Sequence, residues 1–226
     1  MKLVLTIQAI IVALWDDECI VLGDTYETRY NREHPEAPPS PFRINIRTAP
    51  DGPLTREFVF EIGRHMAETL LQTKTRPQFQ GIFGIPNAGN ILMEGFLRQW
   101  PANLYPLILE KVEDGSGRRF NIADTDGLQY HRGYEFWGVD DLVTSLYTKE
   151  MVMSAIPNRV VGISVLIDRS ANAEERLAEK GIMLSSSATT ASMLTILVSA
   201  GRLTSDQAIA IAKADQAFCQ YMADHP

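Results

Sequence analysis

The sequence predicts a single α/β domain in which helices flank a mostly parallel sheet. Short apolar runs of strand length alternate along the chain with longer segments of helical periodicity. The central runs end in polar turns that lead into helices, a pattern typical of parallel strands joined by crossover helices. We find no internal repeat, low-complexity tract or linker, so we treat residues 1–226 as one domain, with 1–50 as a small N-terminal subdomain or hood and 51–226 as the core.

Composition limits the classes of function. The chain of 226 residues is 45% hydrophobic and 22% charged, which is ordinary for a soluble globular protein with a sizeable core. Its net charge of −7 argues against a nucleic acid or an anionic membrane as partner, although a local basic cluster could still bind a phosphate. Cys19 and Cys219 have no metal or redox spacing, and we interpret them as reduced structural thiols in a cytoplasmic protein.

The first fifty residues are the least regular part of the chain. Leu3–Trp15 is almost wholly apolar, but it is shorter than the about 20 residues of a spanning helix and lacks a signal-peptide cleavage pattern, so we expect a buried helix or strand. Cys19–Leu22 before a Gly-Asp turn indicates a strand. Residues 30–41 are rich in proline and predict a surface excursion, either ordered or mobile. Phe42–Arg47 alternates apolar with polar residues and predicts a strand with one wet face.

The middle of the chain predicts helices and strands in alternation. Pro53 suits a first helical turn, and apolar residues then recur at every fourth position as a core stripe: Phe58, Ile62, Met66 and Leu70. We interpret His65, which lies beside this stripe, as a structural histidine. The elements expected next are a strand at 81–86, a helix at 91–100 and a strand at 104–109. Residues 110–133 are polar and without periodicity, which indicates a functional loop, a hairpin or disorder.

The last third predicts two further strands before a pair of helices. Tyr134–Val139 is a buried strand that ends in Asp140 and Asp141, followed by a hydroxyl-bearing turn and a helix from Tyr147 to Ile156. The remaining predicted elements are a strand at 160–167 ending at Asp168-Arg169, a charged helix at 174–180 closed by Gly181, a brief strand at 182–184, a helix at 188–200 closed by Gly201, and a last helix from Thr204, which with Gln207 has capping-box spacing.

Three turns concentrate the potential chemistry. They follow strand ends at Pro86–Gly89, at Asp140–Thr148 and at Asp168-Arg169. If their strands are parallel neighbours, all three lie at one edge of the sheet, where ligands of α/β proteins bind. An acidic pair, a hydroxyl-rich helix start and an arginine suggest a phosphorylated sugar as ligand. The alternative is that Asp140 and Asp141 are only caps and turn residues.

The order of these segments resembles the orotate phosphoribosyltransferases, within the type I phosphoribosyltransferase fold. The resemblance covers about residues 40–215. It depends on an ordered set of short motifs: Ser40–Asn45, Gly84–Gly89, Val139–Ser145, Val165–Arg169 and Lys180–Ile182. That family transfers ribose 5-phosphate from phosphoribosyl pyrophosphate (PRPP) to orotate, a pyrimidine base, with magnesium, in nucleotide synthesis. The resemblance therefore implies a Mg²⁺-dependent transferase, a mostly parallel sheet with a small N-terminal subdomain, and a homodimer.

The resemblance also assigns roles to residues. Asp140 and Asp141 would contact the ribose hydroxyls, and the loop with Thr144, Ser145 and Thr148 would cradle the 5′-phosphate. The turn with Pro86, Asn87 and Ala88 would face pyrophosphate. Arg169 would pair with the base, and Phe42 is a further substrate-binding candidate. Residues 110–133 would form the mobile catalytic loop, with Lys111 and Arg118 as its catalytic cations, and no protein metal ligand is implied.

Two departures from the family pattern lead to a second hypothesis. Leu146 and Tyr147 stand where the family's phosphate loop has glycines, and side chains there should obstruct or reshape the cradle. In the catalytic loop, Glu113 and Gly115 stand at a basic and a histidine position. The alternative is therefore a catalytically degenerate relative that binds a nucleotide or acts as a regulatory or assembly module.

Overall fold

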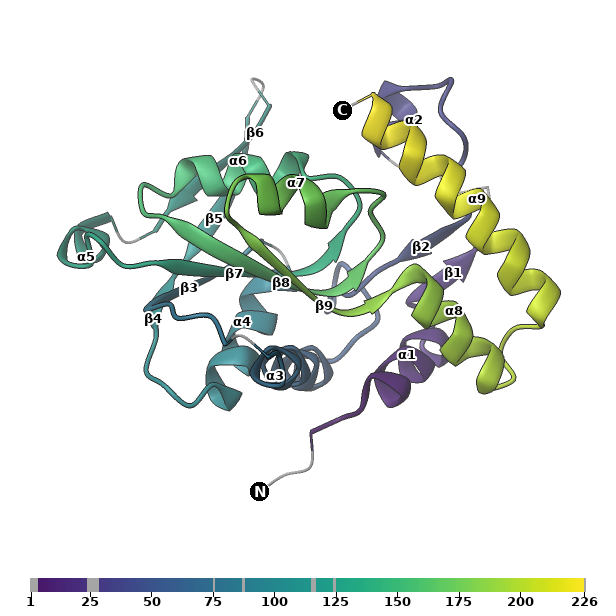
Figure 1. Ribbon diagram of the computed structural model, residues 1–226, viewed down its shortest axis with the longest axis horizontal. Helices are drawn as coiled ribbons and strands as arrows, with labels where there is room; N and C mark the ends of the chain where they lie inside the picture. Colours follow the sequence, from purple (N-terminus) through teal and green to yellow (C-terminus); the bar gives the residue numbers. More distant parts are fainter. Residues whose placement is uncertain are drawn as a thin grey trace.

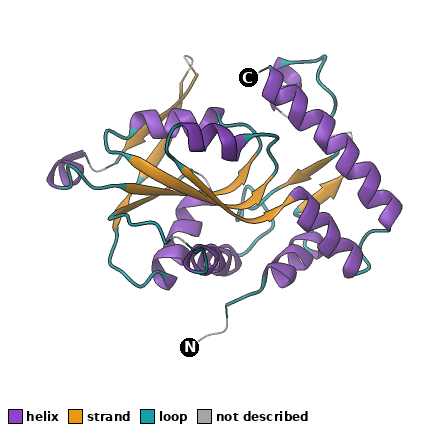
Figure 2. Ribbon diagram, viewed as in Figure 1, coloured by secondary structure: helices purple, strands orange, loops and turns teal. Residues whose placement is uncertain are grey.

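Five parallel strands form one central sheet in the order β4-β3-β7-β8-β9 (Figures 1 and 2). The computed structural model describes residues 4–23, 29–74, 76–86, 88–114, 117–123 and 125–225. The sheet strands are β3 (Gly81–Gly84), β4 (Tyr105–Leu107), β7 (Phe136–Val143), β8 (Val160–Asp168) and β9 (Met183–Thr189). This confirms the predicted α/β class and the mostly parallel sheet.

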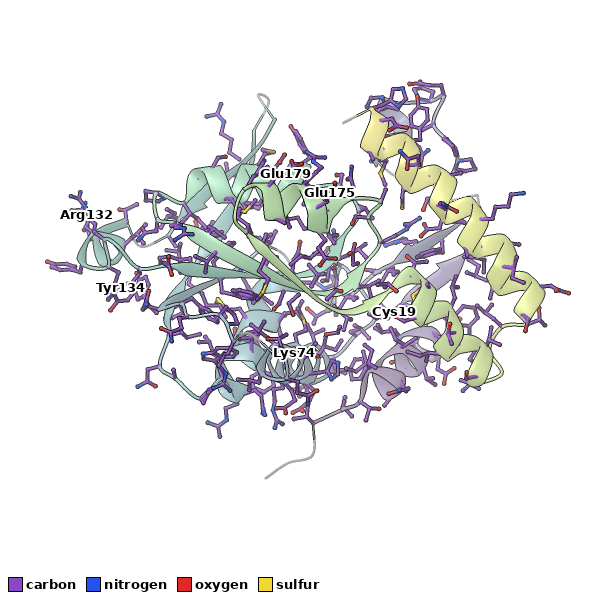
Figure 3. All side chains as sticks on the ribbon, in the orientation of Figure 1. Cys19, Lys74, Arg132, Tyr134, Glu175 and Glu179 are labelled. Atoms are coloured by element: carbon purple, nitrogen blue, oxygen red, sulfur yellow. The ribbon has the colours of Figure 1, made fainter. Side chains whose placement is uncertain are left out.

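Helices cover both faces of the sheet (Figure 1). On one face lie α3 (Arg56–Leu71) and α4 (Ala88–Gln99), and on the other lie α6 (Tyr147–Ala155) and α7 (Ala173–Glu179), whose Glu175 and Glu179 point to solvent (Figure 3). Thr55 caps α3 through its side chain, and Ile62, Met66 and Leu70 of the predicted stripe are buried. His65 donates its Nδ1–H to the Leu5 carbonyl at 2.8 Å, so its structural role is confirmed.

The α3–α4 contact is close because glycines lie on both sides of it. A Cβ on Gly63 would overlap the Leu92 carbonyl, and a Cβ on Gly95 would overlap the Phe60 carbonyl. Side chains fill the space between helices and sheet (Figure 3), and Trp137 at the centre donates its indole N–H to Ser164 Oγ at 2.9 Å. The core therefore depends on both apolar burial and backbone proximity.

The N- and C-terminal segments form a lobe at one side of the sheet (Figure 1). Its elements are α1 (Ile7–Asp16), β1 (Ile20–Leu22), α2 (Arg29–Glu33), β2 (Phe42–Ile44), α8 (Thr190–Ser199) and α9 (Ser205–Asp224). β1 and β2 pair antiparallel. Thr204 and Gln207 form the predicted capping box of α9, and Gly181 and Gly201 end their helices at φ +69°.

Some element boundaries differ from the sequence predictions. β7 does not end at the acidic pair but continues to Val143, because Leu142 and Val143 still pair with β8. The segment predicted at 104–109 divides into β4 and β5 (Leu109–Asp114). β5 pairs antiparallel with β6 (Gly117–Ile122), and α5 (Thr125–Tyr130) follows. Residues 110–133 therefore contain a hairpin, which is one of the three alternatives predicted for this segment. The strand predicted at Phe42–Arg47 has only the three residues of β2.

Both cysteines are buried and free, in keeping with the interpretation as structural thiols. Burial raises the pKa of the Cys19 thiol to about 11 and that of Cys219 to about 12. Within the described ranges, no helix is both long and apolar enough to cross a bilayer.

Candidate functional site

The three polar turns predicted to meet do lie at one edge of the sheet. β3, β7 and β8 are adjacent and parallel, with Gly84 opposite Val139 and Asp140 opposite Val165. Their carboxyl ends therefore point the same way, and the turns after them are neighbours. Gly84 and Gly89 allow α4 to begin close to the sheet, because a Cβ on Gly89 would lie 2.6 Å from the Val139 carbonyl oxygen.

Asp140 is held in an ion pair inside the protein. Its Oδ2 lies 2.5 Å from Nζ of Lys149, in the first turn of α6, and the two side chains are 9% and 8% exposed. The same ammonium donates to the Leu142 carbonyl at 2.5 Å. Two of the three N–H bonds of Lys149 are thus directed at β7, and the charge of Asp140 is compensated where it is buried.

Asp141 is the half-buried member of the acidic pair. Its backbone N–H donates to Asp140 Oδ1 at 2.9 Å. Burial, followed by the adjacent charge of Asp140, raises the pKa of Asp141 to about 7, while the charges of Lys149 and Arg47 act in the opposite direction. Near neutral pH this carboxyl group is therefore divided between a form that donates a hydrogen bond and a form that only accepts.

The loop expected to cradle a phosphate is shaped by its two large side chains. Leu146 turns inward, 2% exposed, and packs with Val143, Ile163 and Leu177 in a small apolar cluster. Tyr147 turns outward and is 63% exposed. Thr144, Ser145 and Thr148 stay half-buried between them, and Leu146 at the helix N-cap makes no side-chain cap hydrogen bond.

A cavity of about 450 Å³ lies at this loop, and we call it the α6 cavity. Its lining comes from the start of α6, the turn before α7, α2 and the end of α9: Tyr30, His34, Thr144, Ser145, Leu146, Tyr147, Thr148, Glu150, Ser170, Asn172, Ala173, Arg176, Met222 and Ala223. Tyr30 and His34 were not among the site residues predicted from the sequence.

Arg169 and Phe42 lie together in the interior. The Arg169 guanidinium is paired with Asp215 of α9 at 2.6 Å from Nε, and it also donates to the Phe42 carbonyl at 3.2 Å and to Ser40 Oγ at 2.8 Å. It lies 4.1 Å from the centroid of the buried Phe42 ring. These contacts give Arg169 a structural role, and the predicted contact with a base would require some of them to break.

The pyrophosphate-facing turn is described in part. Pro86 is half-buried, and Ala88 is buried at the first residue of α4. Asn87 lies outside the described residues. The turn lies at the same edge of the sheet as Asp140, as predicted. Its contact with pyrophosphate stays a prediction.

Comparison with solved structures identifies the fold. UMP synthase from Leishmania donovani superposes with a TM-score of 0.68 at 20% identity, over 95% of this chain and 42% of that chain. Orotate phosphoribosyltransferase from Francisella tularensis gives 0.57 at 14% identity, over 95% and 94% of the two chains. The Mycobacterium tuberculosis orotate phosphoribosyltransferase in complex with PRPP gives 0.55 at 15% identity, over 83% and 98%.

The fold is that of the orotate phosphoribosyltransferases. No protein-family model matches the chain, and no curated protein matches it. This chain spans less than half of the Leishmania UMP synthase but is comparable in length to the other two proteins. At these identities the similarity establishes the type I phosphoribosyltransferase fold and leaves activity and substrate to the residues of this chain.

Within the phosphoribosyltransferase fold, the β5–β6 hairpin, which lies in the predicted catalytic loop, packs near the C-terminal end of α6. Phe120 of β6 shares an apolar cluster with Val152 and Ile156, near the C-terminal end of that helix. Lys111 lies opposite Phe120 in the hairpin register. The side chain of Arg118 lies outside the described residues. The structure thus brings the acids and hydroxyls together at the start of α6, while the hairpin strands are docked elsewhere on the helix.

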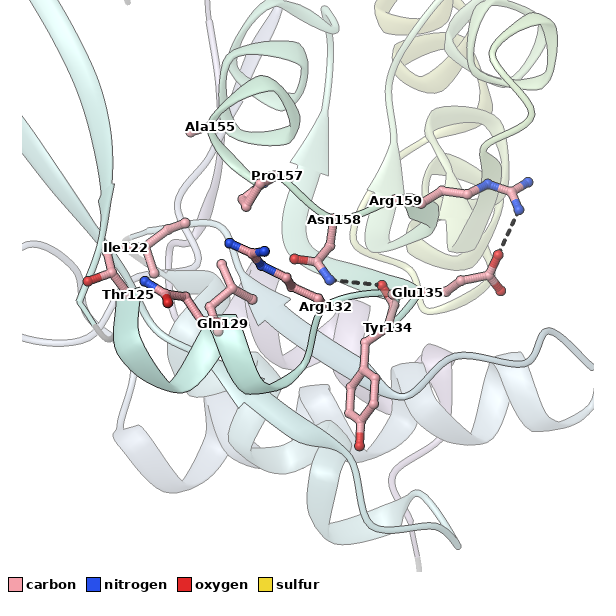
Figure 4. A pocket seen from close by; sticks show the side chains of 12 residues that line it. Ile122, Thr125, Gln129, Arg132, Tyr134, Glu135, Ala155, Pro157, Asn158 and Arg159 are labelled. Atoms are coloured by element: carbon pink, nitrogen blue, oxygen red, sulfur yellow. Dashed lines mark hydrogen bonds and ion pairs between the residues drawn. The ribbon is translucent and has the colours of Figure 1, made fainter.

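The largest of the described cavities, about 760 Å³, lies at the opposite edge of the sheet (Figure 4). Its walls include Glu135 and Arg159, which precede β7 and β8 and form an ion pair at 2.6 Å. Asn158 joins its two sides by donating to the His131 and Tyr134 carbonyls. Because ligands of this fold bind at the carboxyl ends of strands, volume alone does not mark the site.

Sequence reasoning missed three charged residues of this region. Asp215 lies on the buried stripe of α9 with Phe218, Cys219 and Met222, and an acid on such a stripe signals a buried cationic partner. Lys149 had no comparable signal, because a lysine among polar residues near the start of a helix is ordinary. Arg47 follows β2 and acts on Asp141 only through the fold.

Proposed function

We propose that this protein is a phosphoribosyltransferase-like protein that binds a ribose-bearing nucleotide or nucleotide precursor but does not catalyse the transfer of ribose 5-phosphate. The observation that carries the proposal is the Asp140–Lys149 ion pair. Both oxygens of Asp140 are already engaged, one by an ammonium and the other by a backbone N–H, and the side chain is only 9% exposed, so it offers little to the two hydroxyls of a ribose. This favours the degenerate relative among the two hypotheses from the sequence.

Asp141 supports the ligand-binding half of the proposal. It is half-buried at the ligand-binding edge of the fold, and no ion pair of the described residues holds it as Lys149 holds Asp140. In its ionised form it can accept hydrogen bonds from ribose hydroxyls, and Arg47 and Lys149 favour that form. Ribose binding should therefore strengthen as the pH rises through about 7.

The second candidate is PRPP-dependent transfer of ribose 5-phosphate to orotate or another pyrimidine base. It is favoured by the hairpin between β4 and β7, which carries Lys111 in the segment expected to close over the site. In this case Asp141, Thr144, Ser145 and Thr148 would bind the donor. Closure would exclude water from the reactive sugar, which the chemistry requires.

Magnesium belongs only to this second candidate. Among the residues that the structure describes, no group of three or more His, Cys, Asp or Glu side chains could hold a metal. The ion would arrive on the phosphate oxygens of PRPP, as Mg²⁺ commonly does.

One titration series tests both candidates. Isothermal titration would measure the affinity for PRPP with Mg²⁺, for ribose 5-phosphate and for uridine 5′-monophosphate, and orotate consumption would be followed by absorbance. We expect a ribose-bearing ligand to bind, Asp141→Asn to weaken it about tenfold, as loss of a hydrogen bond to a charged group does, and no orotate to be consumed. Orotate turnover would establish the transferase instead. Absence of binding by every ligand at millimolar concentration would overturn both candidates.

Assembly and location are also proposals. By analogy with the family, we propose a homodimer in the cytoplasm, with small-molecule ligands and neither nucleic acid nor membrane as partner. Light scattering after size exclusion would give the mass of the particle. A mass near 25 kDa, that of one chain, would contradict the dimer.

A further inference from the structure

Three aromatic side chains line the α6 cavity. Tyr147 is 63% exposed at the first residue of α6. Tyr30 and His34 of the α2 segment stack on each other with centroids 4.4 Å apart and planes 23° apart. All three border the same volume of about 450 Å³, which is within the size range of small-molecule sites. Aromatic walls of this kind bind flat rings by stacking.

The α2 wall is fixed in position by the end of α9. The Tyr30 hydroxyl donates to the His225 carbonyl at 2.7 Å, and its ring meets Phe218 and Tyr221 edge-on at 6.3 and 6.4 Å. Tyr221 in turn donates to Glu36 at 2.9 Å. This wall is therefore held before a ligand arrives, which reduces the entropic cost of binding.

The charges of the cavity do not suit a phosphate. Glu150 lines it, and a carboxylate repels a phosphate dianion. Arg176 also lines the cavity, and its guanidinium lies 3.5 Å from the Glu150 carboxylate. Glu150 is in turn paired with Lys180 at 2.5 Å. A phosphate would have to compete with Glu150 for both cations.

The remaining lining suits an uncharged ring with polar edges. Leu146 is buried in the apolar cluster beneath the loop, and Met222 adds apolar surface from α9. Thr144, Ser145 and Thr148 supply hydroxyls that can donate to or accept from ring carbonyls and nitrogens. We propose that the α6 cavity binds a neutral heteroaromatic ring, such as that of a nucleoside, at the place where the family pattern would hold a sugar phosphate. This inference rests on the proposed function, since it names the chemistry of the ligand at the same site.

The test compares ring-bearing and ring-free probes on the full chain. Isothermal titration would use uridine and adenosine as neutral nucleosides and ribose 5-phosphate as the ring-free sugar phosphate. We expect at least one nucleoside to bind, Tyr147→Ala to weaken it about tenfold or more, as loss of base stacking does, and Tyr147→Phe to retain it. Tyr130→Ala, which removes an 88% exposed tyrosine from α5, is the matched control and should change nothing.

The possible results separate this inference from the proposed function. Ribose 5-phosphate binding that Asp141→Asn weakens and Tyr147→Ala leaves unchanged or improves would overturn the ring assignment and leave the proposed function standing. Nucleoside binding that is insensitive to Tyr147→Ala would also overturn it. Failure of every probe to bind would overturn the inference together with the proposal on which it rests. A nucleoside affinity lost in Tyr147→Ala, kept in Tyr147→Phe and kept in Tyr130→Ala would support it.

Discussion

At the scale of single residues, Lys149 decides what the acidic pair can do. The ammonium is 8% exposed and shared between Asp140 and the Leu142 carbonyl. Lys149→Met would leave a carboxylate buried without its cation, and we expect the free energy of unfolding to fall by about 3–5 kcal/mol. Urea unfolding at pH 7 measures this loss.

Two further variants make the Lys149 result interpretable. The double variant Asp140→Asn/Lys149→Met removes both charges and should recover most of the stability, because a neutral pair of similar volume has no unpaired charge. Glu135→Gln breaks the more exposed pair with Arg159 and should cost at most about 1 kcal/mol. A Lys149→Met variant as stable as Glu135→Gln would show that the ion pair does not form as described.

Asp141 should give the stability a pH dependence of unusual sign for a carboxyl group. Its pKa is raised from the ordinary value of 3.8 to about 7, chiefly by burial and then by Asp140. Between these two values the folded state binds more protons than the unfolded state, so the free energy of unfolding falls as pH rises and levels off above about 7. This rise in the pKa of Asp141 corresponds to a fall on the order of 4 kcal/mol in the free energy of unfolding. Urea titrations from pH 4 to 8 should show a smaller decline for Asp141→Asn, and an identical decline in both proteins would contradict the raised pKa.

At the scale of elements, α9 is fastened to the sheet edge by the Arg169–Asp215 pair, with both side chains about 5% exposed. Asp215→Ala would leave the guanidinium buried without its carboxylate, and we expect a loss of about 3–5 kcal/mol in the free energy of unfolding. The matched control is Asp16→Ala on α1, which removes the exposed partner of Arg202 and should cost far less stability than Asp215→Ala. Equal losses in the two variants would refute the anchoring role of Asp215.

The elements were predictable where local pattern determines them. The stripe of α3, the capping box of α9 and the apolar runs of β3 and β8 follow from periodicity and turn chemistry, and the parallel order follows from their alternation. The continuation of β7 past Asp141 was not predictable, because only pairing with β8 keeps two acids inside a strand. The charged contacts of Lys149 and Arg169 join residues on separate elements, and no local pattern contains them.

Glycine contacts between α3 and α4 give a further test at the element scale. Gly95→Ala would place a methyl group on the Phe60 carbonyl, and the backbone atoms there cannot move as a flexible side chain would. Overpacking of this kind typically costs about 1–3 kcal/mol, which urea unfolding would detect. An unchanged stability would mean that the two helices are farther apart than described.

At the scale of the whole molecule, the N-terminal segment shares its core with the sheet. Ile10, Ile11 and Leu14 of α1 belong to the same buried cluster as Trp137 of β7 and Leu197 of α8. The chain also returns to this lobe at its end, where Arg202 pairs with Asp16 at 2.7 Å and Tyr30 bonds the His225 carbonyl. Because residues 1–50 pack with α8 and α9 from the other end of the chain, they should not unfold separately from residues 51–226.

This continuity predicts one cooperative unfolding transition. Removing α1 from the cluster would expose apolar surface on α8, so opening the hood alone should cost nearly as much as global unfolding. Hydrogen exchange followed by mass spectrometry across a urea series would compare the peptide containing α1 with the peptide containing β7. We expect the two peptides to lose protection at the same urea midpoint. A lower midpoint for α1 would instead define the N-terminal segment as a separate folding unit, and the α6 cavity, whose α2 wall belongs to that segment, would then open before the sheet does.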